Sequence, residues 1–185
     1  MRQNGKSQHP FAFRNGYKSQ INIKEAIAVR YFMKVRTYEI GDTQQIVKLF
    51  YDTVHQVNIR DYTQAQVDAW APADMDSEIW TKSLSSKFTF VAEEGEKIAG
   101  FGELEASGHI DRFYCHQAFQ RQGVGRLILK QIESKAQDLG INKLFTEASI
   151  TARPFFESQG FMVIKKQEVE RRGQQFINFV MEKNI

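Results

Sequence analysis

Residues 120–126 read Gln-Arg-Gln-Gly-Val-Gly-Arg and join a predicted strand to a predicted helix. Glycine at 123 and again at 125, where the helix begins, lets a ligand approach the backbone closely. The free amides and the positive dipole end of a helix start attract anions, and Arg121 and Arg126 add charge that suits a pyrophosphate. The stretch therefore predicts an anion-binding loop, although glycine pairs at helix starts also serve tight packing. It lacks the Gly-Lys-Ser/Thr of a P-loop and the third glycine of a dinucleotide fingerprint.

On either side of this loop, apolar residues recur at spacings typical of helices and strands. Downstream, apolar residues recur at helical spacing up to a stop at Gly140. They are Val124, Leu127, Ile128, Ile132, Ala136 and Leu139. Upstream, a strand over 108–115 follows two strands, 88–93 and 97–104, which the sequence Glu-Gly-Glu at 94–96 joins as a hairpin.

The rest of the chain continues the alternation of strand and helix periods. We expect further strands over 35–40, 144–148, 161–170 and 175–182, the last two turning at 172–173, and helices over 42–58, 63–69, 76–84 and 152–158. Asp42, with Gln45 three residues on, is the expected start of the first helix. The order β-α-α-β-β-β-α-β-α-β-β predicts an α+β fold, a mixed sheet with helices on both faces.

Charge divides the chain into two parts. The net charge of +3 arises in residues 1–32, which hold six Lys/Arg against one acid, whereas residues 33–185 carry −2. A folded body that is mildly acidic argues against a nucleic-acid-binding domain. We therefore interpret 1–32 as a basic N-terminal extension and 33–185 as one domain, which could begin at Met33 as its own translation start.

The single cysteine and the hydropathy pattern exclude several kinds of site and indicate the cellular compartment. Cys115 by itself excludes an intramolecular disulfide and a multi-cysteine zinc site, and we expect no metal. No apolar run approaches the ~20 residues of a membrane span, so we expect no membrane partner and a cytoplasmic protein.

Two motifs together resemble those of a known family. Gln120-x-x-Gly123-x-Gly125, after a strand that ends Phe-Tyr-Cys-His at 113–116, resembles the acetyl-CoA loop of the GNAT N-acetyltransferases. The stretch 152–161, Ala-Arg-Pro-Phe-Phe-Glu-Ser-Gln-Gly-Phe, is similar to the second signature helix of that superfamily. The resemblance spans about 33 to 183. It implies a GNAT fold, with a mostly antiparallel, splayed central sheet, and acetyl-CoA as acyl donor.

The resemblance also assigns cofactor-binding roles. In the family, the strand before the loop splays from its neighbour and pairs with the pantetheine arm, which places Phe113, Tyr114 and Cys115 along that arm. Cys115 as a nucleophile has no suitably placed base, so we interpret it as a packed apolar residue. The loop residues Arg121, Gln122, Gly123, Val124, Gly125 and Arg126 are expected to hold the pyrophosphate. Ser149 stands where many relatives have an asparagine bonded to pantetheine.

The same resemblance implies direct attack by a neutral amine on the thioester in a ternary complex, which needs a base. His109 and Asp111 lie where relatives often place a catalytic carboxylate, and alternation puts both on one face. They are the expected catalytic residues, with Glu103 and Glu147 as second candidates. The alternative is that His109 lies at a strand end without a catalytic role. Phe156 occupies the position of the family's usual general acid, a tyrosine.

The acceptor is a primary amine of a small molecule or peptide that the sequence does not identify. After the first predicted helix, and reaching into the third, lies a stretch of acids and aromatic rings that suits a cationic amine. It contains Asp61, Tyr62, Asp68, Trp70, Asp74, Asp76 and Trp80, although such acids are more commonly solvated and such tryptophans belong to cores. A homodimer is possible. The alternative function is a non-catalytic CoA-binding sensor or regulatory module, which the missing tyrosine at Phe156 motivates.

Overall fold

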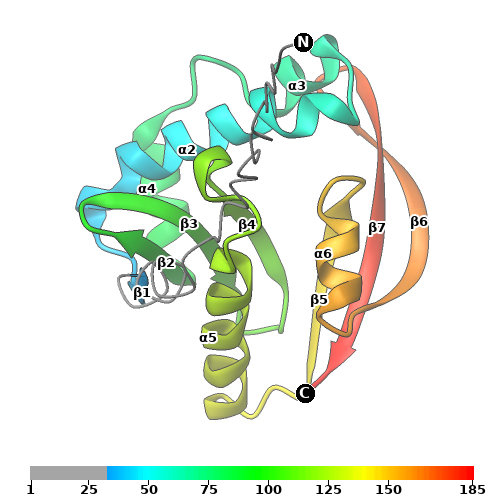
Figure 1. The fold of residues 1–185 in the computed structure, drawn as a ribbon. Helices are drawn as coiled ribbons and strands as arrows, with labels where there is room; N and C mark the ends of the chain where they lie inside the picture. The colour runs from blue at the N-terminus through cyan, green and yellow to red at the C-terminus, as the bar shows by residue number, and fades with distance from the viewer. Residues whose placement is uncertain (1–32) are drawn as a thin grey trace, which may run out of the picture.

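The computed structural model describes residues 33–185, whose strands form two sheets (Figure 1). The first is ordered β1-β2-β3-β4 and the second β5-β7-β6. The first contains β1 (Met33–Thr37), β2 (Phe88–Glu94), β3 (Lys97–Leu104) and β4 (Ile110–Cys115), and the second β5 (Lys143–Ser149), β6 (Met162–Arg171) and β7 (Gln174–Asn184). The predicted basic extension, 1–32, lies outside the described residues.

Every ladder within the two sheets is antiparallel. The β2-β3 hairpin turns at Gly95, where φ is +60°, and the β6-β7 hairpin turns at Arg172 and Gly173, where φ is +47° and +75°. Both turns lie where the sequence predicts them. Each contains a glycine, which adopts positive φ without the steric cost of a side chain.

The two sheets part between β4 and β5. Among residues 33–185, one isolated parallel bridge, His109 to Phe145, joins them. Beside it the Phe145 amide donates to the Gly108 carbonyl at 3.0 Å, and the Thr146 hydroxyl donates to the Ile110 carbonyl at 2.9 Å. Beyond this point β4 and β5 are not ladder neighbours, so their facing edges diverge (Figure 1). The splayed, mostly antiparallel sheet is confirmed.

Helices cover both faces of the first sheet, as predicted. They are α2 (Thr43–Gln56), α3 (Gln64–Trp70), α4 (Ser77–Ser85) and α5 (Val124–Asp138), with short 3₁₀ turns η1 (Ile40–Asp42), η2 (Asn58–Arg60) and η3 (Gln117–Phe119). On one face α2, α3 and α4 pack over Val91 and Phe101. On the other face, α5 packs close to β3. Gly100 and Gly102 permit this approach, because a Cβ at either position would lie within 3 Å of α5 side chains. The last helix, α6 (Arg153–Ser158), contacts β5 and β6 of the second sheet instead. No described helix is both long and apolar enough to cross a bilayer.

The predicted element order counts two helices between the first two strands, and this count is wrong. All three helices predicted there by range, 42–58, 63–69 and 76–84, are present as α2, α3 and α4. Two expectations about strand bounds are also wrong. β1 ends at Thr37 rather than at residue 40, since the chain turns into η1 and leaves Ile40 exposed. β4 begins at Ile110 rather than at residue 108. Gly108 has φ of +90°, and a Cβ there would lie 2.3 Å from the Lys143 carbonyl oxygen, so the chain makes a tight turn.

Candidate active site

The loop 120–126 leads directly into α5. Gly123 precedes the helix at φ +90° without a side-chain cap, and Arg121 also has positive φ, +60°. A helix start leaves its first amides without intrahelical acceptors. The first amide that finds one is that of Leu127, which donates to the Gly123 carbonyl at 3.1 Å. The loop geometry therefore suits an anion.

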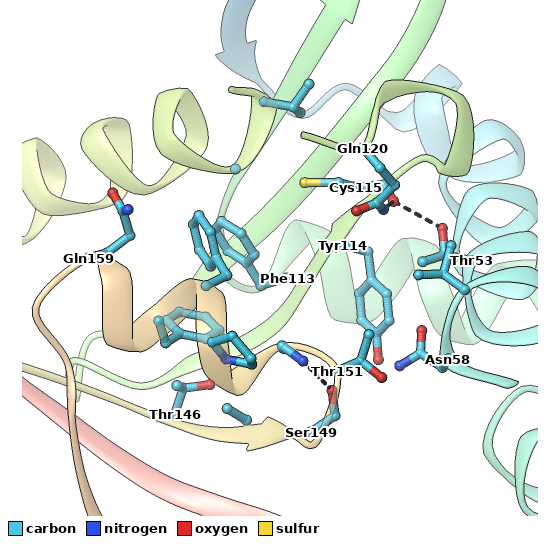
Figure 2. Close-up of a pocket in the computed structure, with 18 of the residues that line it drawn as sticks. Thr53, Asn58, Phe113, Tyr114, Cys115, Gln120, Thr146, Ser149, Thr151 and Gln159 are labelled. Carbon is cyan, nitrogen blue, oxygen red and sulfur yellow. Dashed lines mark hydrogen bonds between the residues drawn. The ribbon is translucent and has the colours of Figure 1, made fainter. Parts of the chain in front are cut away.

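A cavity of about 760 Å³, here called the larger cavity, lies against this loop (Figure 2). Ten of the residues singled out from the sequence line it: Asp111, Phe113, Tyr114, Cys115, Arg121, Gly123, Val124, Gly125, Arg126 and Ser149. Thr53 and Asn58 from the α2 side and Gln159 after α6 are among the other lining residues. Nothing in the sequence singles these three out, because they reach the cavity only through tertiary packing.

The strand β4 forms one wall of the larger cavity. Phe113 turns toward α6, where it stacks on Phe155 at 5.4 Å between ring centroids, and Tyr114 turns toward α2, where its ring lies 4.8 Å from that of Phe50. The Cys115 carbonyl accepts hydrogen bonds from Thr53 Oγ1 at 3.2 Å and Gln120 Nε2 at 2.6 Å (Figure 2). Burial raises the pKa of the Cys115 thiol to about 12, so it stays protonated at neutral pH.

A second, smaller cavity of about 420 Å³ adjoins the larger one. Five residues line both cavities: Trp70, Asp111, Tyr114, Glu147 and Ser149. Asp111 comes from β4, and Glu147 and Ser149 from β5, so the two cavities meet where the sheets diverge. The Ser149 hydroxyl accepts from the Ala152 amide at 3.0 Å, which holds the turn from β5 into α6 (Figure 2).

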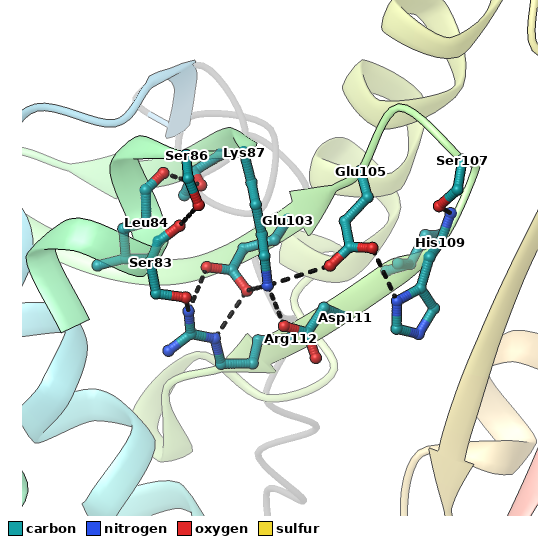
Figure 3. Close-up of polar contacts among 12 residues, drawn as sticks. Ser83, Leu84, Ser86, Lys87, Glu103, Glu105, Ser107, His109, Asp111 and Arg112 are labelled. Atoms are coloured by element: carbon teal, nitrogen blue, oxygen red, sulfur yellow. Dashed lines mark hydrogen bonds and ion pairs between the residues drawn. The ribbon is translucent and has the colours of Figure 1, made fainter. Parts of the chain in front are cut away.

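Asp111 belongs to a polar cluster on β3 and β4 (Figure 3). The β3-β4 register shifts between Gly102 and Leu104, so Asp111 and Arg112 together oppose Glu103 in a bulge. Arg112 donates to both Glu103 carboxylate oxygens at 2.7 Å, and Lys87 forms an ion pair with Asp111. Burial raises the pKa of Glu103 despite these cations. Burial would also raise the pKa of Asp111, but the Lys87 ammonium outweighs it and lowers that pKa.

His109 lies outside both cavities. Its ring stacks on Phe145, its Nε2 lies 2.6 Å from Glu147 Oε2, and its Nδ1 lies 3.5 Å from Glu105 Oε2. Glu147 faces both cavities, so His109 reaches the site only through that carboxylate. Gln122 is the one expected cofactor-binding residue outside the larger cavity, and its side chain donates to the Ala118 carbonyl at 2.9 Å. The second-candidate base Glu103 lines neither cavity.

Phe156 is 2% exposed, and its ring packs against those of Phe113, Phe155 and Phe161 at the edge of the larger cavity. It offers no proton. Burial raises the pKa of Tyr114, so its phenol remains neutral.

The acidic stretch over 61–80 does not present its carboxylates to either cavity. Asp61 accepts from Thr151, Asp68 from Gln64, and Asp76 caps α4. The aromatic residues of the same stretch behave differently, because Tyr62, Trp70 and Trp80 all line the smaller cavity. The acids near the site come instead from the strands, as Asp111 and Glu147.

Comparison with known proteins identifies the family. Residues 58–183 match the model of the acetyltransferase (GNAT) domain. The uncharacterized N-acetyltransferase YafP of Escherichia coli (strain K12) is 33% identical over 150 residues, covering 80% of this chain and 94% of the relative.

Solved structures agree with this assignment. A GCN5-related N-acetyltransferase from Rhodopseudomonas palustris has a TM-score of 0.79 at 28% identity, covering 82% of this chain and 95% of its own. The PaiA N-acetyltransferase of Thermoplasma acidophilum, solved in complex with coenzyme A, has a TM-score of 0.69 at 16% identity, covering 83% and 99%. The second likeness concerns the fold alone. With the matched domain and these relatives, the resemblance in the two motifs is confirmed, and the chain belongs to the GNAT acetyltransferase family.

Proposed function

We propose that this enzyme transfers the acetyl group of acetyl-CoA to a primary amine by direct attack in a ternary complex. One observation carries the proposal: the two cavities meet at the divergence of β4 and β5 and share Asp111, Glu147 and Ser149. A donor in the larger cavity and an amine in the smaller one would therefore have their reacting atoms side by side.

The larger cavity suits acetyl-CoA. Its loop end offers backbone amides of 123–126 and the guanidinium groups of Arg121 and Arg126 for a pyrophosphate. The edge of β4 from 111 to 115, which no described strand covers on the β5 side, offers backbone groups to the pantetheine arm. The coenzyme A bound to the Thermoplasma acidophilum protein is consistent with this use of the fold.

The chemistry needs a base for the ammonium form of the acceptor, and Glu147 is the better placed carboxylate. Lys87 lowers the pKa of Asp111, which makes Asp111 a weak base. Glu147 faces both cavities and has His109 behind it at 2.6 Å. In this scheme Glu147 takes the proton of the acceptor ammonium, directly or through water. His109 acts as a positioning residue and shares this proton with the Glu147 carboxylate.

After deprotonation the amine nitrogen forms its bond to the acetyl carbon and gives up its second proton to water, and the carbon–sulfur bond then breaks. The thiolate of CoA leaves with the electron pair and takes a proton from water. Because CoA thiolate is a good leaving group, Phe156 in place of a tyrosine is compatible with turnover.

The test is Glu147→Gln, with Glu105→Gln as matched control. Both carboxylates contact His109, but Glu105 lines neither cavity. A positioned base contributes ~100- to 10,000-fold, so Glu147→Gln should lower kcat by that range while acetyl-CoA affinity measured by calorimetry stays unchanged. Activity should recover as pH rises and free amine accumulates. Glu105→Gln should keep kcat within about threefold.

Asp111→Asn decides between the two carboxylates. If Asp111→Asn loses the activity and Glu147→Gln keeps it, the base is Asp111, as the sequence indicates. If both variants match the wild type at every pH, proton removal does not depend on a protein base at this site.

The second candidate function is a CoA-binding sensor without turnover, which the apolar Phe156 favours. Release of free thiol from acetyl-CoA across a panel of primary amines separates the two. A wild-type protein that binds acetyl-CoA and releases thiol with none of the amines would favour the sensor.

A further inference from the structure

The smaller cavity is lined by four charged side chains, and three of them already have partners. Arg112 is held by Glu103, Asp111 pairs with Lys87, and Glu147 contacts His109. The fourth is Arg171, the last residue of β6, which is exposed and lines the cavity. Within residues 33–185, Arg171 has no ion-pair or hydrogen-bond partner for its side chain. Its guanidinium is therefore available to an anionic group on a ligand.

A second polar group of this cavity also lacks a partner. Asn178 lies on β7 opposite Ser149, and its Oδ1 is buried without a hydrogen bond from any described residue. Buried polar atoms are nearly always paired, so an unpaired acceptor in a cavity wall calls for a donor on a ligand. The lining therefore suits a ligand that carries both a negatively charged group and an N–H or O–H donor.

The rest of the wall is aromatic. Six rings line the cavity: Phe50, Tyr62, Trp70, Trp80, Tyr114 and Phe176. Tyr62 and Trp70 meet edge to face at 5.2 Å, and Trp70 and Phe176 at 5.9 Å, so the rings form one continuous surface. A volume of about 420 Å³ admits a small molecule with an apolar body.

We propose that the acceptor is a free amino acid with an aromatic or other apolar side chain. The inference rests on the proposed function, because it assigns the acceptor to the smaller cavity. Arg171 binds the carboxylate, the amine lies toward Glu147, and the side chain packs on the rings. A polyamine fits this wall less well, since its second ammonium would meet Arg112 and Arg171.

The test compares two ligands that differ only in a carboxylate, L-phenylalanine and phenethylamine. The chain has two tryptophans, and both line the cavity, so quenching of intrinsic fluorescence in the presence of CoA reports binding without turnover. The wild type should bind L-phenylalanine about ten- to a hundredfold more tightly than phenethylamine, as expected for a charge-assisted contact. The ratio of kcat/KM for the two amines should show the same preference.

Arg171→Gln should remove the preference by weakening L-phenylalanine alone, and Arg171→Lys should restore part of it. Arg172→Gln is the matched control, because the neighbouring guanidinium donates to the Ala69 carbonyl and lines neither cavity. It should keep the wild-type ratio.

Three outcomes overturn the proposal: equal binding of both ligands by the wild type, equal weakening of both by Arg171→Gln, or binding of neither. Failure of the proposed function looks different. In that case L-phenylalanine binds through Arg171 but no thiol is released, and the smaller cavity is a regulatory amino-acid site.

Discussion

Gly123 and Gly125 exclude a side chain for two different physical reasons. A Cβ at Gly123 would have 3.8 Å to its nearest neighbour, Arg126, so space is open, but φ of +90° strains any other residue. Gly125 has an ordinary φ, yet a Cβ there would lie 2.9 Å from the Phe155 ring. The first glycine shapes the loop, and the second admits α6 against α5.

We predict that both alanine variants lose stability, each for a different reason. Gly123→Ala should lower the free energy of unfolding by about 1–2 kcal/mol through backbone strain. Gly125→Ala should displace the Phe155 ring at a cost of about 1–3 kcal/mol from overpacking and weaken acetyl-CoA binding. Urea unfolding and calorimetry measure these effects.

Phe155→Leu supplies the control. It should rescue part of the stability of Gly125→Ala, because it removes the ring atoms that the new methyl group meets, and it should not rescue Gly123→Ala. Equal rescue of both variants would contradict this account.

Asp42 joins β1 to the start of α2. Its carboxylate accepts two hydrogen bonds from Arg36, at 2.7 and 2.8 Å, and one from the Glu39 amide at 2.8 Å. The sequence indicates Asp42 as a helix cap, but its side chain caps no amide of α2, because these partners occupy it. Burial would raise the pKa of Asp42, and the bonds from Arg36 and Glu39 outweigh it and lower that pKa.

Asp42→Asn should therefore destabilise the protein at pH 7 by about 1–3 kcal/mol. A carboxyl whose pKa is lower in the folded state stabilises the fold above its unfolded pKa and loses that effect as pH falls through the folded pKa. The gap between wild type and variant should accordingly be full above about pH 4 and close below it. Thermal unfolding across pH 2–8 measures this gap.

The surface pair of Lys48 and Asp52 is the matched control, since Lys48 is 75% exposed. Asp52→Asn should change stability by no more than about 0.5 kcal/mol at any pH. A pH-independent effect of Asp42→Asn would show that the carboxylate charge is not what stabilises the junction.

At the scale of the whole molecule, the divergence of the two sheets creates the site. The core on the α5 side, which includes Ile128 and Ile132, joins both sheets, whereas the core under α2, α3 and α4 closes the other face. We therefore expect ligands to enter between β4 and β5 without opening either core. The edge of β4 therefore lines the larger cavity, and the junction of β4 and β5 also lines the smaller one.

The domain boundary at Met33 remains a prediction. β1 pairs with β2 from the first described residue, Met33 opposite Glu94. Deletion of 1–32 should leave acetyl-CoA affinity unchanged in calorimetry and the melting temperature nearly so. A fall of many degrees would place part of 1–32 in the folded domain.

The sequence by itself determined the local features. The helix over 124–138, the turns at Gly95 and at 172–173, and the glycine loop depend on periodicity and on φ at single residues, which neighbours along the chain set. Together they were enough for the family and the fold class. The remaining features join residues far apart in the chain.

Only the tertiary structure decided which chemistry faces the site. His109 meets Glu147 across 38 positions of sequence, the β4 bulge sets both Asp111 and Arg112 opposite Glu103, and Arg171 enters a cavity from the end of β6. Strand alternation predicts which residues share a face, but a bulge interrupts the alternation, and the parting of two sheets selects which side chains a ligand can reach. These depend on register and packing between distant segments, which no local pattern in the sequence specifies.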